Sequence, residues 1–148
     1  CGGTSSSSGS YKNGDGEISE VGCGSMKGAE CDMFVGINQY RFTKGLPAYK
    51  SLGKCIRMAE DHAQDMSAKN YFDHNSPTES FGSRISRYGF FSANVTESMA
   101  RGSNSYDIIL NLLKGCAVDN QNLLHPAFRS IGVGFANGYW TICYTSLQ

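Results

Sequence analysis

The sequence carries no excess of charge of either sign. Its 148 residues include 13 Lys or Arg and 13 Asp or Glu, so the formal net charge is zero. Proteins that bind nucleic acid through a broad positive field need a surplus of basic residues. We therefore expect no nucleic-acid partner. The sequence also lacks any apolar run that approaches the roughly 20 residues needed to span a bilayer.

Two signatures of hydrolases are missing as well. There is no Gly-x-Ser-x-Gly turn of the kind that presents a catalytic serine. There is also no pair of histidines at the helical spacing that metalloproteases use. A nucleophile needs a base within hydrogen-bond reach and a pair of donors for the oxyanion. The sequence therefore favours a protein that is not an enzyme, without deciding the point.

The composition is that of one globular domain. Hydrophobic residues make up 40% and charged residues 18%, which suits a chain with a real core. Six cysteines in so short a chain favour an oxidising compartment, although their number does not reveal the pairing. Cys31 and Cys55 lie on the inward faces of two successive predicted helices, so they form a candidate disulfide whose geometry the sequence does not supply.

The first residues differ in composition from the rest. Residues 1–24 are rich in Gly and Ser and predict a flexible tether, so we expect the folded domain to cover residues 25–148. The start, Cys1-Gly2-Gly3 before a serine run, resembles a mature bacterial lipoprotein, whose first cysteine carries lipid. The alternative is a boundary that happens to fall at a cysteine. A lipid on Cys1 would be the only membrane attachment that we expect.

Periodic apolar residues and turn signals outline the secondary structure. We expect a strand over residues 90–100 and a terminal hairpin in which Asn137-Gly138 joins two alternating segments. Helices before and after a small antiparallel sheet imply an α+β layered domain. The expected helices cover residues 30–44, 51–69, 81–88 and 105–114, and the expected hairpin strands cover residues 131–136 and 139–144.

Two of the histidines occupy different settings. His62 shares an apolar helix face with Cys55 and Met66, so we expect it to be buried and hydrogen-bonded within the core. His74 follows that helix in a polar loop, where a side chain is easier to expose. Glu97 lies among small residues in the expected strand. We predict that His74 and Glu97 lie close together in an exposed cleft.

A series of short motifs, in this order and spacing, resembles the CAP superfamily. That superfamily comprises cysteine-rich secretory proteins, venom antigens and plant pathogenesis-related proteins, together with many secreted bacterial members. The matching pieces are Asn38-Gln39-Tyr40-Arg41 with Gly45-Leu46-Pro47, Ala59 through Met66, Tyr71-Phe72-Asp73-His74, Arg84-Ile85 with Gly89-Phe90, Glu97 through Gly102, and Ile131-Gly132-Val133-Gly134 with Tyr139-Trp140.

The resemblance implies a three-layer α-β-α sandwich and an extracytoplasmic protein, whether secreted, periplasmic or tethered to a surface as a lipoprotein. It also implies a cleft that bears two histidines and two acidic residues in many members. By position, His74 matches the first cleft histidine and Glu97 the first cleft glutamate. Asp119 stands where the second histidine usually lies, and the second glutamate has no counterpart. The expected cleft therefore contains His74, Glu97 and Asp119.

Three functions remain open for such a cleft. The first is a non-catalytic binding module for a small molecule, a lipid or a protein partner, which acts as a monomer and requires no cofactor. The second is a divalent-cation site or metal-assisted hydrolase, because one imidazole and two carboxylates from His74, Glu97 and Asp119 are able to bind a cation. The third is a degenerate structural scaffold, in which His74 and Glu97 tie a loop to the sheet.

Overall fold

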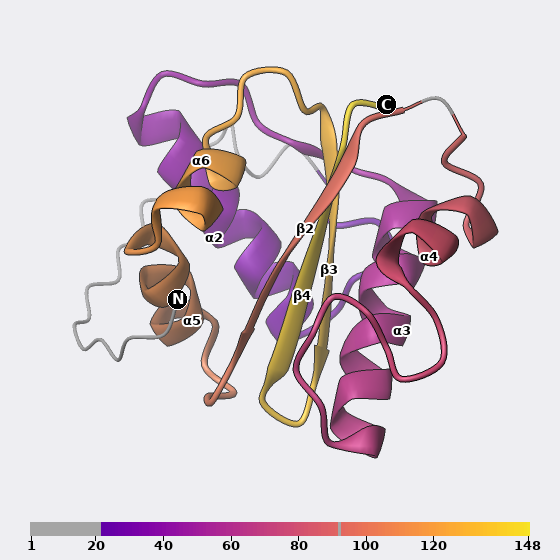
Figure 1. Ribbon diagram of the computed structural model, residues 1–148. Helices are drawn as coiled ribbons and strands as arrows, with labels where there is room; N and C mark the ends of the chain where they lie inside the picture. The colour runs from indigo at the N-terminus through magenta and orange to yellow at the C-terminus, as the bar shows by residue number, and fades with distance from the viewer. Residues whose placement is uncertain (1–21, 92) are drawn as a thin grey trace.

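The computed structural model describes residues 22–91 and 93–148 (Figure 1). Cys1 and nearly all of the expected tether lie outside these residues. The described elements, with the labels of Figure 1, are α2 (Ala29–Thr43), β1 (Lys50–Ser51), α3 (Gly53–Lys69), α4 (Phe81–Arg87), β2 (Val95–Arg101), α5 (Tyr106–Lys114), α6 (Ala117–Leu123), β3 (Ser130–Ala136) and β4 (Tyr139–Thr145).

The strands form one sheet in the order β1-β3-β4-β2. β4 is antiparallel to both of its neighbours, whereas the two-residue β1 runs parallel to β3. The expected α+β sandwich is confirmed. The sequence indicated neither β1 nor α6, and β2 begins at Val95 rather than at Phe90, which is buried instead beside α3.

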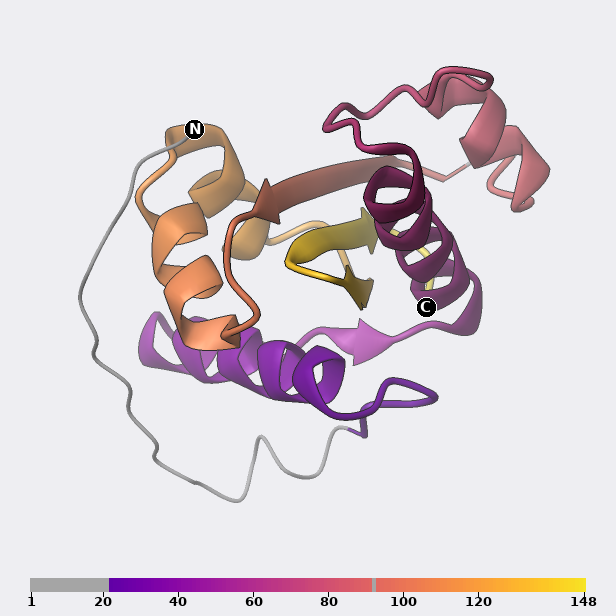
Figure 2. The ribbon, with the colours of Figure 1, turned by 90° about the horizontal axis from the view of Figure 1, so that it is seen from below.

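The helices cover both faces of this sheet. α2, α5 and α6 lie on one side and α3 and α4 on the other (Figures 1 and 2). α2 packs on β3 and α5, while α3 packs on β3 and β4. Most of the core lies between the sheet and α2 with α5, and a smaller cluster lies under α3 and α4.

The hairpin between β3 and β4 has the predicted turn. Both central residues are left-handed, with φ 48° at Asn137 and 81° at Gly138. Two positive φ values define the turn type that matches the twist of a tight hairpin. The register then places Gly132 opposite Cys143, which fixes which residues face α3.

Glycines on β3 let α3 approach the sheet closely. A Cβ atom on Gly132 would lie 2.2 Å from the Ile56 nitrogen, and one on Gly134 would lie 2.2 Å from the Ala59 oxygen. Side chains at these positions would push the helix away, so the backbone of α3 rests directly on that of β3. His62 lies one helical turn beyond Ala59 and is therefore held close to the same face.

The disulfides differ from the expected pairing. Cys55 on α3 bonds to Cys143 on β4, and Cys31 on α2 bonds to Cys23. The expected Cys31–Cys55 bond is wrong because α2 and α3 cover opposite faces of the sheet. The inward faces of α2 and α3 both pack on the sheet, which lies between them.

Candidate functional site

The site is organised around the buried carboxylate of Glu97. Glu97 pairs with Cys143 across the strands, so its side chain lies on the face that α3 covers. This side chain is 1% exposed, and its Oε2 atom lies 2.7 Å from His74 Nδ1, 2.9 Å from Arg84 Nη2 and 4.0 Å from His62 Nε2. Three basic side chains from three segments therefore converge on one carboxylate.

Arg84 fixes both the carboxylate and the loop that carries His74. Its Nη2 donates to both Glu97 oxygens, at 3.1 and 2.9 Å, and to the His74 carbonyl oxygen at 2.7 Å. The Arg84 side chain is 4% exposed. Its Nε and Nη1 atoms have no hydrogen-bond partner within the described part of the chain. Sequence analysis did not assign this residue to the site, because an arginine in a short helix gives no sign that it is buried.

His74 presents its ring to solvent. The side chain is 47% exposed, and its Nδ1 atom faces the Glu97 carboxylate at 2.7 Å. Because an ionised carboxylate only accepts hydrogen bonds, Nδ1 carries a proton, and this N–H donates a hydrogen bond to Glu97. The other ring nitrogen, Nε2, is then the one that is available to contact a ligand. The predicted proximity of His74 and Glu97 is confirmed.

His62 has a structural setting, as expected. It is buried, and its Nε2 atom donates to the Asp73 carbonyl oxygen at 2.8 Å. Tyr71 lies beside the ring and donates its hydroxyl to Asp65 at 2.5 Å. His62 thus holds the start of the loop that carries His74.

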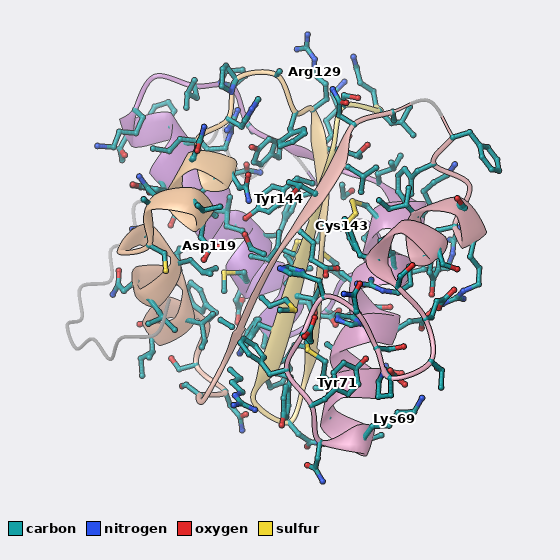
Figure 3. The ribbon with its side chains drawn as sticks, in the orientation of Figure 1. Lys69, Tyr71, Asp119, Arg129, Cys143 and Tyr144 are labelled. Carbon is teal, nitrogen blue, oxygen red and sulfur yellow. A yellow bond between two sulfur atoms is a disulfide. The ribbon has the colours of Figure 1, made fainter. Side chains whose placement is uncertain are left out.

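Asp119 lies on the other side of the sheet. It belongs to α6, whose Asn120 accepts a hydrogen bond from Tyr40 on α2. Burial raises the pKa of Tyr144, and the nearby charges of Tyr49 and Asp119 add to that effect. Tyr144 packs against Tyr49, on the face opposite Glu97. Figure 3 shows Asp119 on the α6 side and Tyr71 on the α3 side.

The expected three-residue cleft is therefore not assembled. The structure brings His74 and Glu97 together and separates Asp119 from them, because the unrecognised helix α6 carries Asp119 into the layer of α2 and α5. Within residues 22–91 and 93–148, no three His, Cys, Asp or Glu side chains are grouped to hold a metal ion. Glu97 is moreover already paired with Arg84.

The contacts set the charge state of the cluster. Burial acts to raise the pKa of Glu97, but hydrogen bonds from His74 and Arg84 outweigh it and hold that pKa below its usual value. The hydrogen bond to Glu97 raises the pKa of His74, whereas burial lowers the pKa of His62. Near neutral pH, Glu97 is ionised and His62 is neutral, while the raised pKa of His74 favours its imidazolium form, in which Nε2 also carries a proton.

An NMR titration of the histidine rings checks this assignment. We expect the midpoint of His74 to lie above 6.5 and that of His62 below 6.5. Glu97→Gln should lower the midpoint of His74, because it removes the negative charge that favours the imidazolium. His125→Gln serves to assign the third ring. A midpoint of His74 at or below that of His62 would contradict the hydrogen bond to Glu97.

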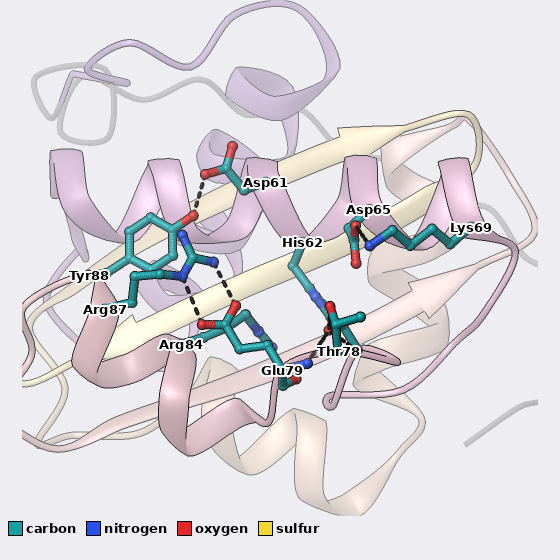
Figure 4. A pocket seen from close by; sticks show the side chains of 10 residues that line it. Asp61, His62, Asp65, Lys69, Thr78, Glu79, Arg84, Arg87 and Tyr88 are labelled. Carbon is teal, nitrogen blue, oxygen red and sulfur yellow. Dashed lines mark hydrogen bonds and ion pairs between the residues drawn. The ribbon is translucent and has the colours of Figure 1, made fainter.

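A polar pocket adjoins the cluster. It has a volume of about 330 Å³ and lies between α3, α4 and the loop that joins them (Figure 4). His62 and Arg84 line it and also contact Glu97, so the pocket and the His74 ring share one buried carboxylate. The lining residues are Asp61, His62, Asp65, Lys69, Ser76, Thr78, Glu79, Arg84, Arg87 and Tyr88.

The sequence matches a known protein family. Residues 34–144 match the family model of the cysteine-rich secretory protein family, CAP. This match covers most of the chain, so the protein belongs to the CAP family. Within the described residues, every helix is too short or too polar to cross a bilayer.

The relatives are bacterial. The uncharacterised protein YkwD of Bacillus subtilis (strain 168) is 30% identical over 109 residues, which cover 70% of this chain and 42% of that protein. An extracellular protein with an SCP domain from Bacillus anthracis str. Ames aligns with a TM-score of 0.69 and 28% identity, over 76% of this chain and 38% of that one. The chain thus spans about two fifths of the length of either protein.

A third relative matches over nearly its full length. An outer surface protein of Borrelia burgdorferi aligns with a TM-score of 0.70 over 93% of this chain and 98% of that chain. Its identity of 14% shows a shared fold only. These two solved relatives are described as extracellular or outer-surface proteins, which is compatible with an extracytoplasmic location for this chain.

Proposed function

We propose that this chain is an extracytoplasmic CAP-domain binding module that holds a small polar ligand at His74 and the adjoining pocket. The observation that carries the proposal is the setting of the His74 ring. The ring is half exposed, yet Glu97 fixes its orientation, and Arg84 fixes both Glu97 and the backbone of His74. Because this hydrogen-bond donor is already held in place before binding, little conformational entropy is lost when a ligand binds.

The pocket supports a polar ligand rather than a lipid. Six of its ten lining residues are Asp, Glu, Lys or Arg, and the others include a histidine, a serine and a threonine. An acyl chain in this pocket would remove charged groups from water without replacing their hydrogen bonds. Two disulfides among the described residues and the extracellular relative from Bacillus anthracis support the location. A lipid on Cys1 stays part of the proposal as one route of surface attachment.

The proposal is tested by an NMR screen of small polar compounds against protein with isotopically labelled histidine rings. Amino acids, short peptides, organic acids and monosaccharides make up the library. We expect at least one compound to shift the His74 resonance. Calorimetric titration should then show that this compound binds His74→Ala about tenfold or more weakly, since a charged hydrogen bond contributes roughly 1.5–3 kcal/mol. His125→Ala is the matched control, because His125 packs on Phe128 away from the site.

A structural scaffold is the second candidate. It is favoured by Arg84 Nη2, which joins the His74 carbonyl oxygen to the Glu97 carboxylate and so ties the loop to β2. Under this alternative, His74→Ala changes stability alone. A screen in which no compound shifts the His74 resonance more than that of His125 would overturn the binding proposal and leave the scaffold.

A further inference from the structure

The pocket beside the cluster has walls of opposite charge. On one wall, α3 presents Asp61 and Asp65, one helical turn apart. Facing them, α4 presents Arg84 and Arg87 (Figure 4). Carboxylates and guanidinium groups therefore line one pocket of about 330 Å³ from different sides. That volume falls at the lower end of the range of roughly 300–1,000 Å³ for small-molecule sites.

The acidic wall is only partly occupied by protein partners. Asp61 accepts a hydrogen bond from the Tyr88 hydroxyl. Asp65 accepts one from Tyr71 at 2.5 Å and pairs with Lys69 at 3.0 Å. A carboxylate offers about four acceptor sites. Both groups therefore retain capacity for a donor from a ligand, and the tyrosines fix their orientation.

On the basic wall, Arg84 has buried donors without a partner among the described residues. Arg87 is engaged by Glu79 through two bonds of 2.8 Å. Arg84 uses Nη2 for three acceptors, while its Nε and Nη1 atoms have no partner within the described residues although the side chain is 4% exposed. Buried donors without partners are rare in native proteins. Both atoms are buried and Arg84 lines the pocket, so an acceptor that enters the pocket deeply would give them a partner.

The charges of the lining residues disfavour any ligand that carries only positive or only negative charge. Asp61, Asp65 and Glu79 are acidic, and Lys69, Arg84 and Arg87 are basic, so the formal charges of the lining cancel. A simple anion would meet the aspartates of α3, and a simple cation would meet the arginines of α4. One small molecule with both charges satisfies both walls.

We propose that this pocket binds a zwitterion of amino-acid or dipeptide size, with its ammonium group against Asp61 and Asp65 and its carboxylate against Arg84. This inference rests on the proposed binding function and names the class of ligand. Neutral sugars and organic acids are then poorer ligands than free amino acids or peptides.

Four forms of one dipeptide test the two charges separately. They are L-alanyl-L-alanine, its N-acetyl derivative, its C-terminal amide, and the peptide blocked at both ends. Affinities are measured by NMR titration of the full chain at neutral pH. We expect the free dipeptide to bind about tenfold or more tighter than either singly blocked form, because each block removes one charged hydrogen bond.

Substitutions then assign each charge to a wall. Asp65→Asn should abolish most of the preference for the free amine and leave the preference for the free carboxylate. Asp32→Asn, an exposed position on α2 at the opposite face, is the matched control and should change neither. Arg84→Lys keeps the positive charge but removes Nε and Nη1, so it should reduce the preference for the free carboxylate. Circular dichroism confirms that each variant is folded.

The outcomes separate this inference from the function on which it rests. Equal affinities for the four forms would overturn the zwitterion while the binding module stands. So would a failure of all four forms when the histidine screen finds another ligand. A failure of all four forms together with an empty screen would overturn both. A preference for the free amine that survives Asp65→Asn unchanged would also contradict the assignment.

Discussion

Removing the Cys55–Cys143 disulfide, as Cys55→Ala with Cys143→Ala, should lower the free energy of unfolding by about 4–5 kcal/mol. The bond joins residues 88 apart in sequence and lies fully buried between α3 and β4. A cross-link that closes so long a loop removes much conformational entropy from the unfolded chain. Denaturant unfolding of both proteins under oxidising conditions measures the difference.

The second disulfide supplies a control. Cys23 and Cys31 are 8 residues apart, so the same substitutions there should cost about 2.5 kcal/mol. The two losses should therefore differ by about 2 kcal/mol. Equal losses would contradict the view that loop length sets the contribution of each bond, and a larger loss at Cys23–Cys31 would reverse it.

Replacing Glu97 by glutamine should destabilise the protein by about 3–5 kcal/mol, because it leaves the buried charge of Arg84 without its partner. Glu79→Gln is the matched control. Glu79 also pairs with an arginine, but the Arg87 side chain is 53% exposed, and exposed pairs contribute about 0–1 kcal/mol. The double variant Glu97→Gln with Arg84→Met should recover part of the loss, since no unpaired charge then remains.

The same carboxylate gives stability a pH dependence with a definite sign. The folded pKa of Glu97 lies below the ordinary value of 4.5. Its contribution is therefore fully present above pH 4.5 and is lost as the pH falls through the lower folded pKa. Unfolding measured as a function of pH should show this loss in the wild type and a weaker one in Glu97→Gln. Equal slopes for the two proteins would contradict it.

Sequence patterns predicted the elements better than their arrangement. Apolar periodicity located α2, α3 and α5 to within one or two residues, and Asn137-Gly138 located the hairpin, because these signals are local. Periodicity identifies the inward face of a helix but not which face of the sheet it covers. The Cys31–Cys55 pairing failed for that reason.

The candidate site shows the same division. His74 and Glu97 were found from family-like motifs, and both are in place. Asp119 was assigned by counting residues back from β3, and that count could not reveal that a short helix turns this segment toward α2. Arg84 was missed as a site residue because a buried charge interrupts an apolar pattern instead of contributing to it.

The order of strands in the sheet also governs when this domain is able to fold. β3 and β4 hold the two central positions, yet they are the last elements of the described chain, and the earlier strands β1 and β2 pair only with them. During synthesis, neither β1 nor β2 has a partner until residues 130–145 exist. Sheet formation is therefore a late event that closes long loops, and such topologies fold slowly. A chain truncated before β3 is left with two unpaired strand edges, which are templates for aggregation.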